Sequence, residues 1–134
     1  MNTPATHRLE ELSVDECLTL LAGKSLGRLV YLLNGEPQIR PLTYGLQRGS
    51  VVFRIGYGEL LDAIHQQPVV FEVDHGDPSV RTGWSIIIRG IAEEIWQTDD
   101  LEAARETDLR PWAPGTRDHY VRIIPRSMTG RRIA

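Results

Sequence analysis

The Asn34-Gly35 pair constrains the fold most strongly, because it lies between two runs of strand-forming residues. Asn-Gly between alternating apolar residues is the strongest short-range hairpin signal, since both central positions of a type I′ turn need a positive φ. A strand at 27–33 is therefore expected to pair with a return strand over 38–46. Pro37 and Pro41 lack the N–H that a central strand donates, so the return strand is predicted at a sheet edge or in an irregular stretch.

The rest of the chain repeats this alternation of short apolar runs and turn-rich segments. Further strands are expected at 51–55, 69–74, 84–92 and 119–124. Short helices are expected at 60–67 and 99–106, the second capped by Thr98 or Asp99. Successive antiparallel strands in a chain of this size favour a closed barrel, because closure removes exposed edges. The predicted fold class is mainly β with inserted helices, an α+β arrangement.

One helix is predicted near the start of the chain. Ser13-Val14-Asp15-Glu16 has the spacing of a capping box, in which the Ser13 side chain and the Glu16 side chain each bond the other's backbone N–H. Apolar residues then recur at helical spacing to about Gly23. Cys17 lies on this apolar stripe with no positive neighbour to activate it, so an inert core thiol is expected.

Residues 1–12 show no apolar periodicity and are predicted to form a mobile or loosely docked N-terminal arm. The remainder, residues 13–134, is predicted to be one domain. The 134 residues are 41% hydrophobic and 25% charged, which is ordinary for a globular chain. A single cysteine excludes an internal disulfide framework.

The charge balance of 15 basic against 18 acidic residues argues against a general nucleic-acid binder. Lys24 is the only lysine, so any anion site must use guanidinium groups or backbone N–H donors. No apolar run is long enough to span a bilayer. The first residues have neither the basic start nor the apolar stretch of a signal peptide. A cytoplasmic protein without a membrane partner is therefore expected.

The sequence reveals no self-contained set of catalytic side chains. The four histidines are scattered without the spacing of a zinc helix, and no nucleophile elbow or phosphate loop occurs. Gly56-Tyr57-Gly58 indicates a tight turn only. His75 lies beside Asp74 and Asp77, where Gly76 favours a solvated turn over a metal loop. No metal site and no catalytic residue are predicted.

Four segments occur along the chain in an order that is more specific than any single segment. They are Arg40–Tyr44, Val52–Leu61, Pro68–Asp74 and Gly83–Ala92, followed by the ending Trp112–Ile133. Together they resemble the pyridoxamine 5′-phosphate oxidase-like family of split barrels that bind flavin mononucleotide (FMN), in its small actinobacterial-type branch. The resemblance covers about residues 10 to 133.

This resemblance implies a homodimer of six-stranded antiparallel split β-barrels with two FMN sites in the clefts between subunits. The implied activity is that of a flavin-dependent oxidoreductase of unknown substrate. The implied cofactor-binding residues are Leu42 and Thr43 beside the isoalloxazine ring, Arg54, Ile55, Gly56, Glu59 and Leu60 at the ribityl phosphate, Trp84 and Ser85 at the polar edge of the flavin, and Trp112 of the partner subunit over the ring.

Two positions depart from the family pattern at the implied phosphate site. Family members commonly carry a hydroxyl residue where Ile55 stands and a lysine where Glu59 stands. Ile55 cannot donate a hydrogen bond, and Glu59 brings a negative charge near a dianionic phosphate. Three interpretations stay open: weak FMN binding by an oxidoreductase, a non-enzymatic split-barrel dimer that binds a small molecule or a protein, and a deazaflavin-dependent reductase.

Overall fold

The computed structural model describes residues 7–107, 109 and 119–134. Over these residues the chain forms eight strands and three helices. The strands are β1 (Leu9–Leu12), β2 (Leu26–Leu33), β3 (Glu36–Thr43), β4 (Gly45–Gln47), β5 (Ser50–Ile55), β6 (Pro68–Asp77), β7 (Thr82–Glu94) and β8 (His119–Ile133). The helices are α1 (Val14–Ala22), α2 (Glu59–Ile64) and α3 (Thr98–Arg105). The mainly β class with inserted helices is confirmed, and β1 and β4 are short strands beyond the six expected.

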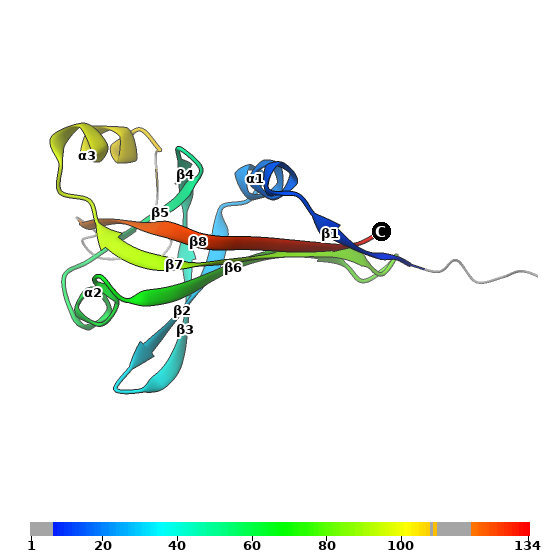
Figure 1. The fold of residues 1–134 in the computed structure, drawn as a ribbon, viewed down its shortest axis with the longest axis horizontal. Coiled ribbons are helices and arrows are strands. Elements are labelled where there is room, and N and C mark those ends of the chain that lie inside the picture. The colour runs from blue at the N-terminus through cyan, green and yellow to red at the C-terminus, as the bar shows by residue number, and fades with distance from the viewer. Residues whose placement is uncertain (1–6, 108, 110–118) are drawn as a thin grey trace, which may run out of the picture.

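All strands belong to one antiparallel sheet with the order β3-β2-β6-β7-β8-β5-β4, and β1 pairs with the far end of β8. Strands β3 and β4 lie at opposite edges of this order, yet only Tyr44 separates them in sequence. The sheet must therefore curl back on itself, which makes it a split barrel. Figure 1 shows β6, β7 and β8 along the long axis, with the β2–β3 hairpin crossing them.

The hairpin predicted at Asn34-Gly35 is confirmed. Asn34 has a φ of 52° and Gly35 a φ of 79°, the positive values that a type I′ turn needs, and Leu33 pairs with Glu36 across it. The return strand β3 lies at the sheet edge, as its prolines predict.

Helix α1 begins at the predicted capping box. The Glu16 N–H donates to the Ser13 Oγ over 3.1 Å, and the Ser13 N–H donates to the Glu16 Oε1 over 3.0 Å. Cys17 is fully buried, and burial raises the pKa of its thiol. A raised pKa keeps the thiol protonated and unreactive.

Several local expectations differ from the structure. The turn expected at His75 and Gly76 is part of β6, which continues to Asp77, and the helix expected to run to 67 ends at Ile64. Strand β8 runs to Ile133 instead of ending near 124, because a shift in register against β7 accommodates Pro125. Helix α3 has Gln97 at its N-cap without a side-chain hydrogen bond, so the capping role predicted for Thr98 or Asp99 is wrong. Residues 9–12, assigned to the arm, pair as β1 with the end of β8.

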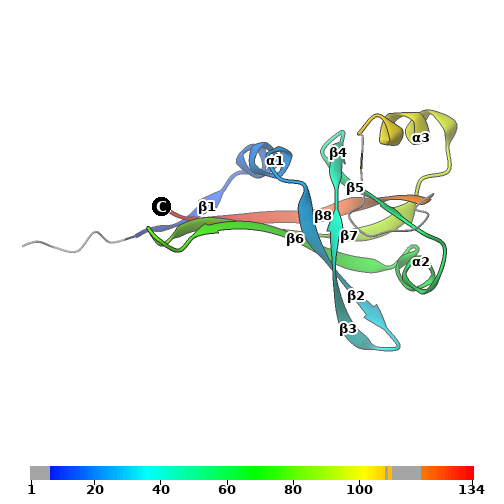
Figure 2. The same ribbon diagram turned by 180° about the vertical axis from the view of Figure 1, so that it is seen from behind.

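Two apolar cores lie on opposite faces of β5. The larger core fills the barrel and includes Phe53, Phe71 and Ile88, and the smaller core lies against α3. Alternation along β5 therefore directs Phe53 into the barrel and the neighbouring Val52 toward α3. Figures 1 and 2 show α2 and α3 near one end of the long strands, on opposite sides of the sheet. No helix in the described residues is long and apolar enough to cross a membrane.

Candidate functional site

Arg54 lies near the end of β5, on the face that carries the smaller core. Its Nη1 donates to the carbonyl of Leu109 over 3.1 Å, and its guanidinium carbon lies 5.2 Å from the centroid of the Tyr120 ring. The second contact has the geometry of a cation–π interaction. The Arg54 side chain is partly buried, so these contacts hold its charge at a defined place on the outside of the barrel.

The other residues that the resemblance implies at the ribityl phosphate divide between the interior and the surface. Ile55 is 3% exposed and Leu60 is 7% exposed, and both pack in the larger core. Gly56 is half-buried just after β5, and Glu59 is an exposed first residue of α2. Of these five residues, Arg54, Gly56 and Glu59 are the ones that present a surface to a ligand.

Leu42 and Thr43 end β3 and pair with Gly27 and Leu26 of β2. Both are partly buried, and Leu42 packs against the larger core. The end of β3 leads directly into β4, which pairs with β5, and β3 itself contacts β5. The fold thus brings the residues implied at the ring toward those implied at the phosphate.

Trp84 and Ser85 are not brought to that place. On β7 they pair with Arg132 and Arg131 of β8, whereas Arg54 pairs with Tyr120 near the start of β8. At the rise of an extended strand, Arg132 is about 40 Å from Tyr120 along β8. An FMN molecule is far shorter, so Arg54 and Trp84 of one chain do not reach the same flavin. Trp112 lies outside the described residues.

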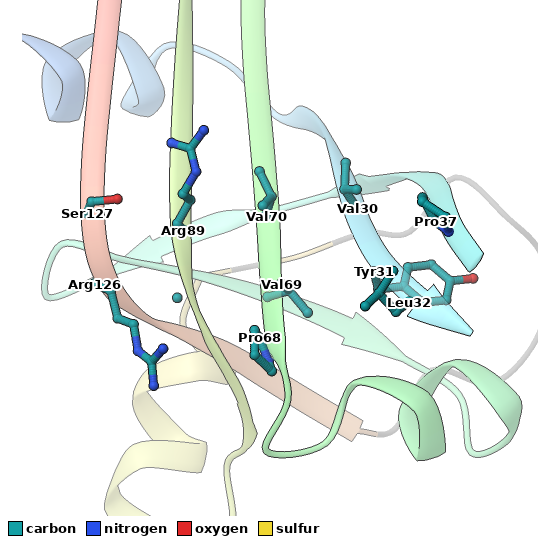
Figure 3. A pocket seen from close by; sticks show the side chains of 11 residues that line it. Val30, Tyr31, Leu32, Pro37, Pro68, Val69, Val70, Arg89, Arg126 and Ser127 are labelled. Atoms are coloured by element: carbon teal, nitrogen blue, oxygen red, sulfur yellow. The ribbon is translucent and has the colours of Figure 1, made fainter. Parts of the chain in front are cut away.

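A pocket that the sequence did not reveal opens on the outer face of β2, β6, β7 and β8, and we call it the outer-face pocket. Its volume is about 530 Å³. None of the candidate residues that the structure describes lines it. It is lined by Val30, Tyr31, Leu32, Pro37, Pro68, Val69, Val70, Arg89, Gly90, Arg126 and Ser127. Figure 3 shows Arg89 and Arg126 rising from neighbouring strands and extending in opposite directions along them.

One sequence signal points to this pocket in retrospect. Arg89-Gly90 interrupts the run of β-branched residues from Ile86 to Ile91. A charged residue followed by glycine inside a buried strand often marks a bulge or a close backbone approach.

Comparison with known proteins finds solved structures of the same architecture, and one of them is a FAD binding protein. The chain is 35% identical to the FAD binding protein from Mycobacterium smegmatis, with a TM-score of 0.82, covering 93% of this chain and 100% of that one. A conserved protein of unknown function from Corynebacterium diphtheriae is 28% identical with a TM-score of 0.79, covering 94% and 98% of the two chains. An uncharacterized protein of Mycobacterium tuberculosis is 35% identical over 130 residues, which are 92% of this chain and 84% of the relative.

The family model described as pyridoxamine 5′-phosphate oxidase matches residues 13–132. The chain therefore belongs to the pyridoxamine 5′-phosphate oxidase-like family, as the order of its segments predicted. Its split-barrel fold is confirmed by the same comparisons.

Proposed function

We propose that this protein binds a flavin and acts as a cytoplasmic oxidoreductase of the pyridoxamine 5′-phosphate oxidase-like family. One observation carries the proposal: the chain matches an FAD binding protein at 35% identity over 93% of its length. Proteins that share this much sequence and fold over their full length commonly share a ligand class. FMN is the flavin that the family resemblance implies, and the relative's name makes FAD its direct competitor.

The arrangement of the candidate residues supports a homodimer. Arg54 and Trp84 lie too far apart along β8 to contact one flavin within a chain. A two-fold symmetric dimer provides two copies of each residue, so Trp84 of one subunit can complete the site that contains Arg54 of the other.

The described residues fit a flavin in their chemistry. The guanidinium of Arg54 suits a phosphate because it presents several N–H donors in one plane. The partly exposed hydroxyls of Thr43 and Ser85 suit the polar edge of the ring system. The flavin supplies the redox chemistry when it is bound. The chain's own residues bind and orient it, and the strand surfaces around Leu42 exclude water from one face.

The residues implied at the phosphate are less suited to binding it than those of the family pattern. Ile55 is buried and donates no hydrogen bond, and Glu59 adds an exposed negative charge at the start of α2. These two residues favour a second candidate function, a split-barrel dimer that binds a small molecule or a protein partner without redox turnover.

The test is a titration of the purified protein with FMN, FAD and riboflavin, followed by the quenching of flavin fluorescence. We expect saturable binding of FMN or FAD, with riboflavin bound more weakly because it has no phosphate. Arg54→Gln should weaken FMN binding about tenfold and leave riboflavin unchanged. Arg48→Gln, at an exposed arginine in the β4–β5 turn, is the matched control and should leave both unchanged.

Two results would decide against this function. A protein that is colourless when purified and takes up none of the three flavins is not a flavoprotein, and the binding-only dimer then becomes the better description. Uptake of a deazaflavin in place of FMN would identify the deazaflavin-dependent reductase instead.

A further inference from the structure

We propose that Asp74 determines how the flavin ring is oriented, by accepting a hydrogen bond from the N3–H of the ring. The inference rests on the proposed function, because it adds a neighbouring side chain to the site implied at Ser85. FMN, FAD and riboflavin all carry this N3–H, so the assignment does not depend on which flavin the protein binds.

Asp74 lies directly beside Ser85 on the neighbouring strand. The two residues are cross-strand partners in the antiparallel pairing of β6 with β7. Directly opposite residues in such a pair point to the same face of the sheet, with Cβ atoms about 4.5 to 5.5 Å apart. A ligand that contacts the Ser85 hydroxyl is therefore within reach of the Asp74 carboxylate.

Both side chains point to the outside of the barrel, as Arg54 does. Val73 and Ile86 are fully buried in the larger core. Because side chains alternate along a strand, the residue after Val73 and the residue before Ile86 point away from that core. The proposed dimer therefore brings Arg54 of one subunit and the Asp74–Ser85 pair of the other to one flavin from the same kind of surface.

The hydrogen-bonding groups of the flavin select the carboxylate. The polar edge of an oxidised flavin ring carries two carbonyl oxygens, and N3–H, the single N–H of the ring, lies between them. The hydroxyl of Ser85 both donates and accepts, and the guanidinium of Arg131, which pairs with Ser85 from β8, only donates. The carboxylate of Asp74 only accepts. Asp74 is thus the matching partner for N3–H, whereas Ser85 and Arg131 match the carbonyl oxygens.

Arg28 on β2 restricts the orientation of this carboxylate. Its Nη1 donates to the Oδ2 of Asp74 over 3.1 Å and to the Oε1 of Glu72 over 2.7 Å. A carboxylate has two oxygens and accepts several hydrogen bonds at once. Asp74 can therefore keep its bond to Arg28 and still accept one from the flavin.

The experiment compares the binding of FMN and 3-methyl-FMN, in which a methyl group replaces the N3 hydrogen. The wild type should bind FMN about tenfold more tightly, because the methylated ring has no hydrogen to donate to Asp74. Asp74→Leu keeps a side chain of similar size without an acceptor, so it should weaken FMN about tenfold and lose the preference. Asp74→Asn should retain the preference, since its amide oxygen still accepts a hydrogen bond.

Glu72→Gln is the matched control. Glu72 also accepts from Arg28, but its cross-strand partner is Ile87, further along β7. This variant should keep the preference for FMN over 3-methyl-FMN. The proposal is overturned if the wild type binds both flavins equally well, or if Asp74→Leu retains the full preference while FMN still binds. Absence of any flavin binding by the wild type is a different result, and it would overturn the proposed function together with this inference.

Discussion

The Nδ1 of His119 lies 2.7 Å from the Oε2 of Glu94, a side chain that is only 7% exposed. A carboxylate accepts and does not donate, so the imidazole N–H satisfies an oxygen that water reaches poorly. His119 is also the cross-strand partner of Ile55, at the end of β5 where the residues implied at the ribityl phosphate lie. The pair therefore holds together the strands β5, β7 and β8 at that end of the barrel.

His119→Leu should destabilise the protein by about 1 to 3 kcal/mol, because it leaves the buried carboxylate of Glu94 without this partner. Chemical denaturation measures the change. The double variant His119→Leu, Glu94→Leu should lose less than the sum of the two single variants. His65→Leu, at an exposed histidine, is the control and should be near neutral. Strictly additive losses would show that the contact contributes no coupling.

Ser13→Ala should destabilise the fold by about 1 kcal/mol, since it removes one half of the capping box at the start of α1. For a chain of this size the melting temperature should fall by roughly 3 to 6 °C. Ser25→Ala, at an exposed serine after the helix, should leave it nearly unchanged. Flavin affinity is expected to stay the same in both variants. Equal melting temperatures for the two variants would contradict the capping role.

Glu59→Lys should tighten FMN binding about 10- to 100-fold if the phosphate lies near the start of α2. The substitution removes a repulsive charge and adds an attractive one, so both effects have the same sign. The gain should shrink at high salt, and riboflavin should bind as before. Asp62→Lys makes the same charge change one turn along α2 and should have a smaller effect. Equal effects of the two variants would indicate a general charge effect and no local phosphate site.

Stability should depend on pH through Glu72. Burial, and then the neighbouring carboxylate of Asp74, raise the pKa of Glu72 to about 7, although Arg28 lies 2.7 Å away and acts in the opposite direction. A raised pKa in the folded state gives a stability contribution that is complete below the unfolded pKa near 4.5 and is lost as pH rises through 7.

Glu72→Gln removes this titration. Its melting temperature should match the wild type at about pH 5 and exceed it increasingly toward about pH 8. Glu36→Gln, in the exposed β2–β3 hairpin, should show no such trend. A glutamine variant that becomes less stable than the wild type at the higher pH would mean that the Arg28 ion pair dominates.

The dimer proposal predicts complementation between two defective variants. Arg54→Ala and Trp84→Ala should each weaken flavin binding. Light scattering should show that the protein is a dimer, and its interface is expected to bury more than about 2,000 Å² in total. After the two variants are unfolded together and refolded in equal amounts, about a quarter of the sites should bind FMN normally, since each mixed dimer regains one intact site. Mixing that restores no sites would show that Arg54 of one subunit and Trp84 of the other do not share a flavin.

The sequence by itself determined the features whose causes lie within a few residues. Asn34-Gly35 specified the hairpin because its backbone tolerates positive φ, and Ser13 with Glu16 specified the start of α1 through two local hydrogen bonds. The prolines of β3 predicted a sheet edge because proline has no backbone N–H to donate to a neighbouring strand. The order of the segments was enough to identify the family.

Only the tertiary structure decided which distant residues meet. Arg89 and Arg126 line one pocket because a register shift between β7 and β8 adds a residue to one strand, and pairing register depends on the whole sheet. Arg54 and Trp84 are implied at one cofactor, yet they lie on β5 and β7 beside opposite ends of β8. The alternation of residues in the sequence indicates that β8 is a strand. Its length and its neighbours depend on its simultaneous pairing with β1, β5 and β7. That pairing is a property of the folded sheet, because each contact joins segments far apart in the chain.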